Sequence, residues 1–381
     1  MAALYVHIPF CRHLCPYCDF YSVEAAGAED AFLRALCREI ALRGDRAGGE
    51  HLDSVFLGGG TPSLLTPDQV SMVLAEVRRS WPVDPCAEIT LETNPGTVDR
   101  AKLAALRETG VNRLSIGVQS FDDGELRFLG RIHTARDAAE CLASAREAGF
   151  GNISLDLLYA IPGQTEPGWE KTLRTAVSLA PAHISAYGLV VEEGTPLWEA
   201  VRRGDVRPAA EEQEARLFER TMELLEAEGY EHYEVSNYAL PGHACRHNLT
   251  YWGHGNYIGV GPSAHSFWRD ARGLVPPRRW ANVADGAAYT DRIRQAGSAV
   301  EFEEELTPGM LLTESLFLAL RSRGVEEEAL RRAGRTEGGG LPGLLEDLIG
   351  KGLVRREGGR IRLTRAGFLL CDEITSRILS C

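Results

Sequence analysis

Three cysteines lie close together near the start of the chain, in the stretch "CRHLCPYC" that begins at Cys11. Cys11, Cys15 and Cys18 are separated by three residues and then by two, and such spacing predicts a metal site. A structural zinc ion normally takes four protein ligands, so His7 or His13 would have to complete that set. Cys15 and Cys18 alone would also suit a redox or zinc pair.

A [4Fe–4S] cluster explains why a fourth cysteine is absent. Three thiolates hold three of its irons, which leaves the last iron free to bind the amine and carboxylate of a substrate and to pass an electron into it. The chain has nine cysteines, and an odd total with six of them scattered fits poorly with a disulfide framework. A reducing compartment would keep the clustered thiols free for metal.

The first 240 residues alternate apolar, β-rich runs with helical patterns. Strands are expected over residues 4–10, 52–60, 87–96, 111–121, 152–163 and 183–191, and helices follow them over 30–42, from Thr66, and over 99–109, 134–149, 166–179 and 209–228. Six such units predict an α/β fold with a parallel sheet and right-handed crossovers. We favour a partial (β/α)6 TIM-like barrel over an open doubly wound sheet.

Motifs with polar or glycine residues follow the expected strands. The cysteine loop follows the first, "GGGTPS" ends the second, "ETNPG" the third and "VQSF" the fourth, while Asp156 lies in the fifth. In a barrel these carboxyl ends meet at one mouth. The glycines let a ligand approach the backbone closely, and no Lys-Ser or Lys-Thr follows them, which excludes a Walker phosphate loop.

The cysteine spacing resembles that of the radical S-adenosylmethionine (SAM) superfamily, and Tyr17 before the last cysteine fits it too. In that superfamily the open iron chelates the methionine part of SAM, and reductive cleavage gives a 5′-deoxyadenosyl radical. The resemblance implies a radical SAM barrel that carries a [4Fe–4S] cluster and SAM.

Longer motifs point to one group within this superfamily. "LYVHIPFC", "GGGTPS", "ETNPG", "RLSIGVQSF" and "DLLYAIPGQT" together are similar to the oxygen-independent coproporphyrinogen III oxidase group over residues 4–240. In that group the three cysteines hold the cluster, and the tyrosine six residues before the first contacts SAM, which is Tyr5 here. The other positions that match SAM contacts are Gly59, Gly60, Thr61, Glu92, Gln119, Arg131 and Asp156.

The group contains two activities. The oxidase decarboxylates two propionates of a porphyrinogen and has a fourth cysteine two residues after the third, where this chain has Phe20. Only four residues precede Tyr5, another departure from the oxidase. Both differences resemble the HemW-type haem chaperone branch, which binds haem and delivers it to haem-requiring proteins such as respiratory, membrane-associated ones. The resemblance thus implies a chaperone without coproporphyrinogen oxidase activity and without catalytic residues, with the oxidase as the alternative.

A second motif of that branch occurs at "RHNLTYW", which matches the H-N-x-x-Y-W element associated there with haem binding. His247 is then the candidate axial ligand, because a neutral imidazole is a normal ligand of haem iron. Tyr251 and Trp252 would pack on the macrocycle. Cys245 is a weaker alternative ligand, and a histidine hydrogen-bonded to backbone is the structural alternative.

Periodicity fades after residue 240. We expect a radical SAM barrel over 1–240, a Gly/His/aromatic-rich segment and linker over 241–300, and a small winged-helix-like α+β domain over 301–381. Its arginines form a local positive cluster at Arg355, Arg356, Arg360, Arg362 and Arg365. The net charge of −13 nevertheless argues against nucleic acid as a partner.

The chain has neither a signal-peptide pattern nor an apolar run of about 18 residues, the length a membrane span requires. We therefore expect a cytoplasmic protein. A homodimer is among the assemblies that the sequence leaves open.

Overall fold

Six parallel strands form the centre of the computed structural model, which describes residues 2–24, 29–44, 49–270, 273, 275–333 and 340–380. They are β1 (Ala2–Ile8), β4 (Leu52–Gly59), β5 (Val83–Thr93), β6 (Arg113–Gln119), β7 (Asn152–Tyr159) and β8 (His183–Gly188), paired in this order. The expected partial barrel of six β/α units is confirmed.

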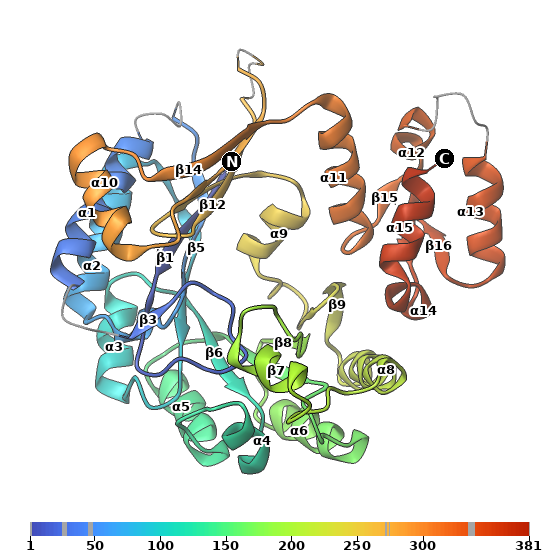
Figure 1. Cartoon of the computed structure of the whole chain (residues 1–381), viewed down its shortest axis with the longest axis horizontal. Helices are drawn as coiled ribbons and strands as arrows, with labels where there is room; N and C mark the ends of the chain where they lie inside the picture. Colours follow the sequence, from blue (N-terminus) through green and yellow to red (C-terminus); the bar gives the residue numbers. More distant parts are fainter. Residues whose placement is uncertain are drawn as a thin grey trace.

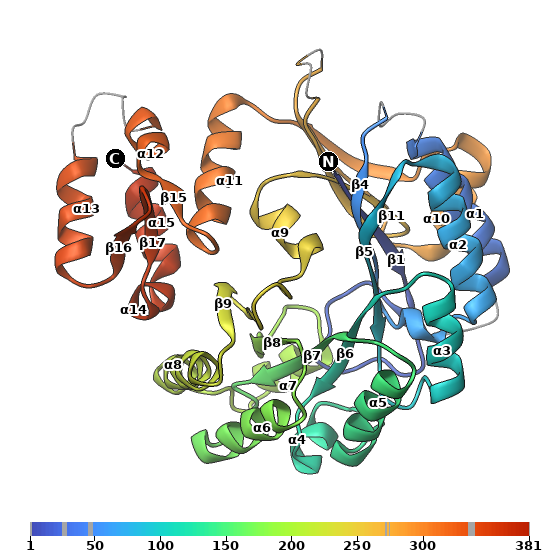
Figure 2. The same cartoon turned by 180° about the vertical axis from the view of Figure 1, so that it is seen from behind.

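Helices cover the outside of this sheet (Figures 1 and 2). The main ones are α1 (Glu29–Gly44), α2 (Pro67–Ser80), α3 (Arg100–Glu108), α5 (Ala135–Glu147), α6 (Glu166–Ser178) and α8 (Glu211–Ala227). The predicted start of α2 is confirmed, because Thr66 and Gln69 form a capping box. Within the described residues, no helix combines the length and the apolar composition that crossing a bilayer requires.

Side chains alternate strictly along the strands. In β6, Leu114, Ile116 and Val118 are fully buried in the core beneath the helices. Arg113 and Ser115, which alternate with them, point into the barrel and line a cavity there. The outer faces of the strands thus make the core, and the inner faces make a polar interior.

Short elements surround the mouth of the barrel. They are β2 (Phe10–Cys11), β3 (Val23–Glu24), the 3-10 turn η1 (Pro62–Leu64), α4 (Asp123–Phe128) and α7 (Pro196–Arg202). None of them was expected from the sequence, since segments this short carry little periodicity.

The segment over 241–300, expected as a Gly/His/aromatic-rich stretch and a linker, also contains regular elements. It contains α9 (Arg246–Trp252), β11 (Asn256–Val260), β12 (His265–Trp268), β13 (Arg278–Asn282) and α10 (Gly286–Ala296), and β14 (Val300–Glu305) follows. β11 pairs parallel with β1, and β12 to β14 continue the sheet antiparallel. At the other edge β10 (Asn237–Ala239) and β9 (Glu231–Glu234) extend β8. Both edges of the barrel sheet are therefore covered by added strands.

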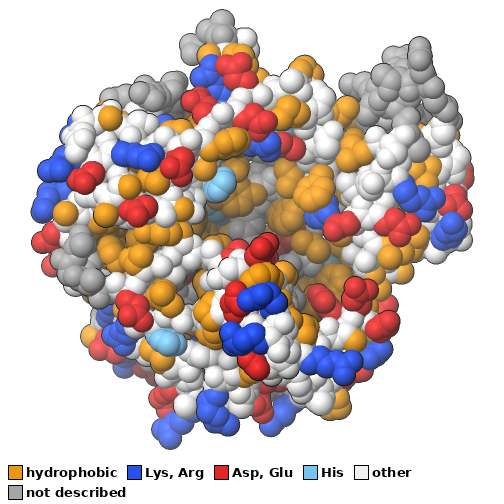
Figure 3. Space-filling view, viewed as in Figure 1, with side chains coloured by type: hydrophobic (Ala, Val, Ile, Leu, Met, Phe, Trp, Pro, Cys, Tyr) orange, Lys and Arg blue, Asp and Glu red, His pale blue; other side chains and the backbone are white. Residues whose placement is uncertain are grey.

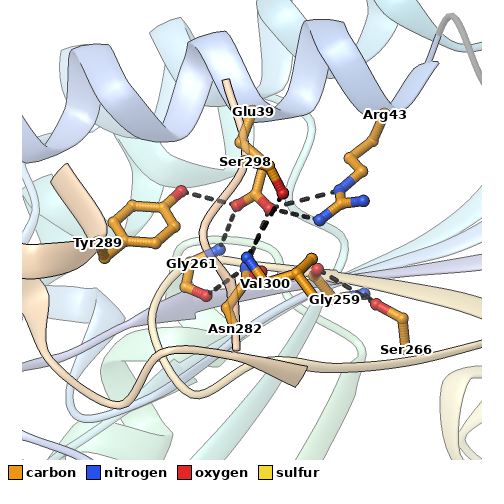
Figure 4. A network of polar contacts seen from close by, with 9 residues as sticks. All are labelled: Glu39, Arg43, Gly259, Gly261, Ser266, Asn282, Tyr289, Ser298 and Val300. Atoms are coloured by element: carbon orange, nitrogen blue, oxygen red, sulfur yellow. Dashed lines mark hydrogen bonds and ion pairs between the residues drawn. The ribbon is translucent and has the colours of Figure 1, made fainter. Parts of the chain in front are cut away.

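The elements β11 to β14 and α10 are called the extension below. A buried carboxylate connects this extension to the barrel (Figure 4). Glu39 of α1 is 1% exposed and pairs with Arg43 at 3.2 Å. Its carboxylate accepts hydrogen bonds from the backbone N–H of Gly261, from Nδ2 of Asn282 and from the hydroxyl of Tyr289, at 2.7–2.9 Å. One side chain thus connects α1 with the β11–β12 turn, β13 and α10.

The C-terminal domain has a core of its own, with Leu320, Leu348 and Ile361 fully buried. It contains α11 (Pro308–Leu320), β15 (Val325–Glu326), α12 (Glu327–Ala333), α13 (Leu341–Gly350), β16 (Val354–Glu357), β17 (Arg360–Leu363), α14 (Arg365–Leu369) and α15 (Cys371–Leu379). The sheet order β15-β17-β16, with a Gly358–Gly359 turn, matches the expected winged-helix outline. All five arginines of the predicted positive cluster form ion pairs with glutamates.

We predict that Glu39→Ala lowers the free energy of unfolding by about 3 kcal/mol, because it leaves Arg43 and three hydrogen-bond donors buried without their partner. Chemical denaturation measures this. Glu140→Ala is the control: Glu140 pairs with Arg136 at the surface, and its loss should cost less than about 1 kcal/mol. Equal effects of the two substitutions would contradict the role of Glu39.

Candidate cofactor-binding site

The three glycines at the end of β4 support the cysteine loop. Gly59 has φ +109°, a conformation that favours glycine, and its N–H donates to Glu92 Oε2 at 3.0 Å. A Cβ on Gly60 would lie 2.7 Å from the carbonyl oxygen of Phe10, so no side chain fits there. The next residue, Thr61, donates from its backbone N–H to the same carbonyl at 2.7 Å. Close packing of two backbones thus sets the position of the loop.

The three cysteines are half-buried beside this turn. Thr61 Oγ1 donates to Cys11 Sγ at 3.5 Å, and Arg131 Nη1 donates to Cys15 Sγ at 3.6 Å. Burial raises the pKa of Cys18 to about 11, so the bare loop favours the neutral thiol. Metal binding would have to release that proton.

Zinc was an open alternative for this loop. His7 is not placed to complete a zinc set, because its Nδ1 is hydrogen-bonded to the Tyr5 hydroxyl and its Nε2 to the Tyr21 carbonyl. Among the residues described, no three His, Cys, Asp or Glu side chains are arranged to hold a single metal ion. In a [4Fe–4S] cluster the thiolates are spread over different irons.

Two carboxyl groups face the interior below the mouth. Burial, and after it the negative charge of Asp156, raises the pKa of Glu92 to about 8. Burial also raises the pKa of Asp156, although it accepts hydrogen bonds from Ser115 at 2.9 Å and from Ser154 at 3.1 Å. A bound ligand with an ammonium group or ribose hydroxyls would supply further partners for these carboxyl groups.

Arg131 and Gln119 lie near these carboxyl groups and add a cation and an amide to the polar interior. Arg131 Nη2 donates to Asn94 Oδ1 and to the carbonyl of Gly117, both at 2.6 Å, so its guanidinium is held between the cysteine loop and β6. Gln119 ends β6 with φ +67°, a strained conformation for a residue other than glycine. This conformation turns the chain at the end of β6, at the edge of the cavity.

Most predicted site residues meet in one cavity of about 440 Å³. Its walls include Tyr17, Cys18, Gly59, Gly60, Thr61, Glu92, Gln119, Arg131 and Asp156. Cys15 lines a smaller pocket next to it with Thr61 and Arg131. Tyr5 does not line the cavity, because its hydroxyl points to His7 and its ring packs against Gly58.

Other lining residues were missed from the sequence. They include Phe56, Asn94, Arg113, Ser115, Ser185, Tyr187 and Asn248. Alternation along the strands is the signal that could have found several of them, since Arg113 and Ser115 precede Gln119 by even numbers of residues. Asn248 carries no such signal, because α9 reaches the cavity only through tertiary packing.

The residues present fit the group that the cysteine spacing implies. The hydroxyl of Thr93 and Nε of Arg113 are buried without a hydrogen-bond partner in the described structure, and both residues line the cavity. Glycines keep the wall beside the cysteine loop free of side chains. An arginine cation, two carboxyl groups and a glutamine amide line this cavity and together suit a nucleoside that carries an amino acid.

The predicted haem ligand His247 lies on α9, and its role as an axial ligand stays a prediction. It is 1% exposed in the middle of the barrel. Its Nδ1 is hydrogen-bonded to Ser54 Oγ at 2.9 Å, and its Nε2 to the Tyr251 hydroxyl at 2.8 Å, so both ring nitrogens are engaged. Burial lowers the pKa of His247 to about 3. The alternative ligand Cys245 is also fully buried, with its Sγ 3.3 Å from Glu88 Oε1.

Comparison with known proteins agrees with this architecture. The model of the Radical SAM superfamily matches residues 5–176. Heme chaperone HemW of Bacillus subtilis (strain 168) is 37% identical over 100% of this chain and 99% of its own length. Heme chaperone HemW of Mycobacterium tuberculosis (strain ATCC 25618 / H37Rv) is 35% identical over 99% and 94%. This chain belongs to the HemW family of radical SAM proteins.

A solved structure extends the likeness to the whole fold. Coproporphyrinogen III oxidase (HemN) from Escherichia coli, a radical SAM enzyme, superposes with a TM-score of 0.83 at 25% identity, over 99% of this chain and 89% of its own. Membership of the radical SAM superfamily implies a [4Fe–4S] cluster and SAM in this HemW-family protein, which together supply an electron and a 5′-deoxyadenosyl group. The expected cofactor class is thereby confirmed.

We predict that Gly60→Ala impairs assembly of the cluster, because the added Cβ would push the cysteine loop away from β4. A loss of stability of about 1–3 kcal/mol should accompany the change. Iron and acid-labile sulfide after anaerobic reconstitution measure the first effect. Gly151→Ala is the control, since a Cβ there meets nothing within 4 Å. Full cluster content in Gly60→Ala would show that the contact is dispensable.

The raised pKa of Glu92 predicts a pH dependence of stability in cofactor-free protein. The folded state keeps the proton up to about pH 8, whereas an unfolded glutamic acid loses it near pH 4.3. The contribution of this group is present at low pH and is lost as pH rises through about 8. Wild type should therefore lose stability relative to Glu92→Gln between about pH 5 and 8, by up to about 1.4 kcal/mol per pH unit. Parallel unfolding curves across this range would refute the shift.

Proposed function

We propose that this protein is a haem chaperone that carries a [4Fe–4S] cluster and SAM, binds haem and passes it to haem-requiring proteins. The observation that carries the proposal is the 37% identity with Heme chaperone HemW of Bacillus subtilis along the entire chain. A likeness over the full length includes α9, the extension and the C-terminal domain as well as the barrel.

In this proposal Cys11, Cys15 and Cys18 hold the cluster. The glycines and Thr61 bind the methionine part of SAM through backbone groups. The site residues assigned to SAM are Tyr5, Tyr17, Gly59, Gly60, Thr61, Glu92, Gln119, Arg131 and Asp156. Support comes from the cavity that most of these residues share. Tyr5 would act indirectly, by holding His7 and Gly58 in place.

The alternative function is that of an oxygen-independent coproporphyrinogen III oxidase, and the fold of HemN favours it. Phe20 argues against this alternative. It stands where the oxidase group has a further cysteine, lines the cavity and is 65% exposed. An exposed phenyl ring at the mouth offers an apolar contact and no thiol for chemistry.

We infer that the clients include respiratory, membrane-associated proteins, that delivery starts from the cytoplasm, and that transfer does not involve nucleic acid. Pairing of the five C-terminal arginines with glutamates supports the last point. We also propose a homodimer, which sedimentation velocity measurements test.

Parallel assays on anaerobically reconstituted protein separate the two functions. We expect stoichiometric haem binding and no conversion of coproporphyrinogen III when SAM and a reductant are supplied. HemN from Escherichia coli is the positive control for conversion. Robust decarboxylation by this protein would restore the oxidase as its function.

A further inference from the structure

Two of the three clustered cysteines accept hydrogen bonds from side chains that lie outside the cysteine loop. Thr61 Oγ1 donates to Cys11 Sγ at 3.5 Å, and Arg131 Nη1 donates to Cys15 Sγ at 3.6 Å. Thr61 follows β4, whereas Arg131 follows α4. Because the two donors come from distant parts of the chain, tertiary contacts must set how they point at the sulfurs.

One amide side chain contacts both donors. Asn94 Nδ2 donates to Thr61 Oγ1 at 3.0 Å, and Asn94 Oδ1 accepts from Arg131 Nη2 at 2.6 Å. Because the Thr61 hydroxyl accepts here, its single hydrogen is left for Cys11 Sγ. A flipped amide would bring Nδ2 against Arg131 Nη2, donor against donor. The two contacts therefore fix the orientation of the amide.

The turn after β5 holds Asn94 itself in place. Its backbone N–H donates to Ser63 Oγ at 3.4 Å, and its carbonyl accepts from the Thr97 hydroxyl at 2.7 Å. The hydroxyls of Ser63 and Thr97 are hydrogen-bonded to each other at 2.7 Å, and both residues are buried. The amide thus extends from a backbone that is fixed on two sides, which is how a positioning group is held precisely.

Gly117 of β6 leaves the space in which this amide meets the guanidinium. A Cβ on Gly117 would lie 2.6 Å from Asn94 Oδ1 and 2.9 Å from Arg131 Nη2. The Gly117 carbonyl accepts from Arg131 Nη2 at 2.6 Å as well. Gly117 is not among the glycines with positive φ, so its backbone does not require glycine. The space beside Asn94 and Arg131 does.

Two spaces border the cysteine loop. A pocket of about 30 Å³ beside Cys15, with room for one or two water molecules, is lined by Thr61, Asn94 and Arg131. The same three residues line the cofactor cavity, as does Asn248 of α9. Figure 3 shows the molecule hollowed in front of α9. The donors therefore face the sulfurs where water is scarce, and electrostatic interactions are stronger in such surroundings.

Hydrogen bonds to the sulfurs are one of the factors that set the reduction potential of an iron–sulfur cluster. One-electron reduction adds a negative charge to the cluster and its thiolates. A hydroxyl or guanidinium that donates to a thiolate stabilises this charge and therefore raises the reduction potential. Residues that orient such donors influence a metal site nearly as much as the donors themselves.

We propose that Thr61 and Arg131 raise the reduction potential of the [4Fe–4S] cluster and that Asn94 is the positioning residue for both. The inference rests on the proposed assignment of the cluster to the three cysteines. One electron passes from a dissolved reductant to the cluster, and no bond forms or breaks. Thr61 has two separate roles: its backbone serves SAM, as proposed above, and its hydroxyl serves Cys11.

A redox titration of the reconstituted full chain with dithionite, followed by EPR of the reduced cluster, tests the proposal. SAM is omitted, so its contacts do not enter the measurement. Thr61→Val removes the hydroxyl and should lower the midpoint potential, whereas Thr61→Ser keeps it and should titrate as wild type. Asn94→Ala should lower the ratio of reduced to oxidised cluster at a given potential by about tenfold, which is about 59 mV for one electron.

Asn112→Ala is the matched control. Asn112 precedes β6, at the opposite end from the mouth, and its amide also joins two partners: Nδ2 donates to the Ala87 carbonyl and Oδ1 accepts from the Ile89 N–H, both at 2.8 Å. Its loss should lower the melting temperature and leave the midpoint potential unchanged. Gly117→Ala deletes neither partner but separates Asn94 from Arg131, so it should lower the potential as Asn94→Ala does.

Iron and acid-labile sulfide are measured before each titration. If wild type takes up no cluster, the proposed cofactor assignment falls and this inference with it. If Asn94→Ala carries a full cluster and titrates as wild type does, only the role of Asn94 is wrong. If Asn94→Ala loses the cluster, Thr61→Val decides, and an unchanged potential there would overturn the proposal. Haem is absent throughout, so the chaperone function is judged separately.

Discussion

The pleat of six parallel strands is the constraint on which the rest of the structure depends. Every second side chain of each strand must point into the barrel, and the carboxyl ends of all six strands meet at one mouth. In this protein the inward positions carry polar residues such as Arg113, Ser115 and Asp156. The outward positions carry the core. A barrel interior that is normally filled by branched apolar side chains is therefore left as a cavity.

This cavity is electrostatically costly without a ligand. Glu92 and Asp156 have raised pKa values because burial disfavours their ionised forms, and Arg113 is 2% exposed with its Nε unpaired. Polar and titratable groups are thus buried in a site that would be more stable if it were apolar. The capping boxes, the buried strands and the Glu39 network offset that cost elsewhere in the fold.

Helix α9 occupies the open side of the barrel. α9 enters the interior from this side, and a row of rings runs from Phe56 through His247, Tyr251 and Tyr257 to Phe267. One end of this row is at the cofactor cavity, and the other is at the strands of the extension. The extension thereby fixes α9 in the barrel.

The sequence by itself determined the cysteine spacing, the six β/α units and the helix caps, because each depends on residues that are near one another in the chain. It also determined most of the cavity, because the carboxyl ends of parallel strands meet at one edge. The burial of His247, the joining of β11 to β1 and the exposure of His265 were decided only by tertiary structure. The reason is physical. Strands of four or five residues that pair with a partner some 250 residues away leave no local period, and a histidine's environment depends on what packs around it. The same residue type can therefore be a hydrogen-bonded core group at 247 and an exposed imidazole at 265.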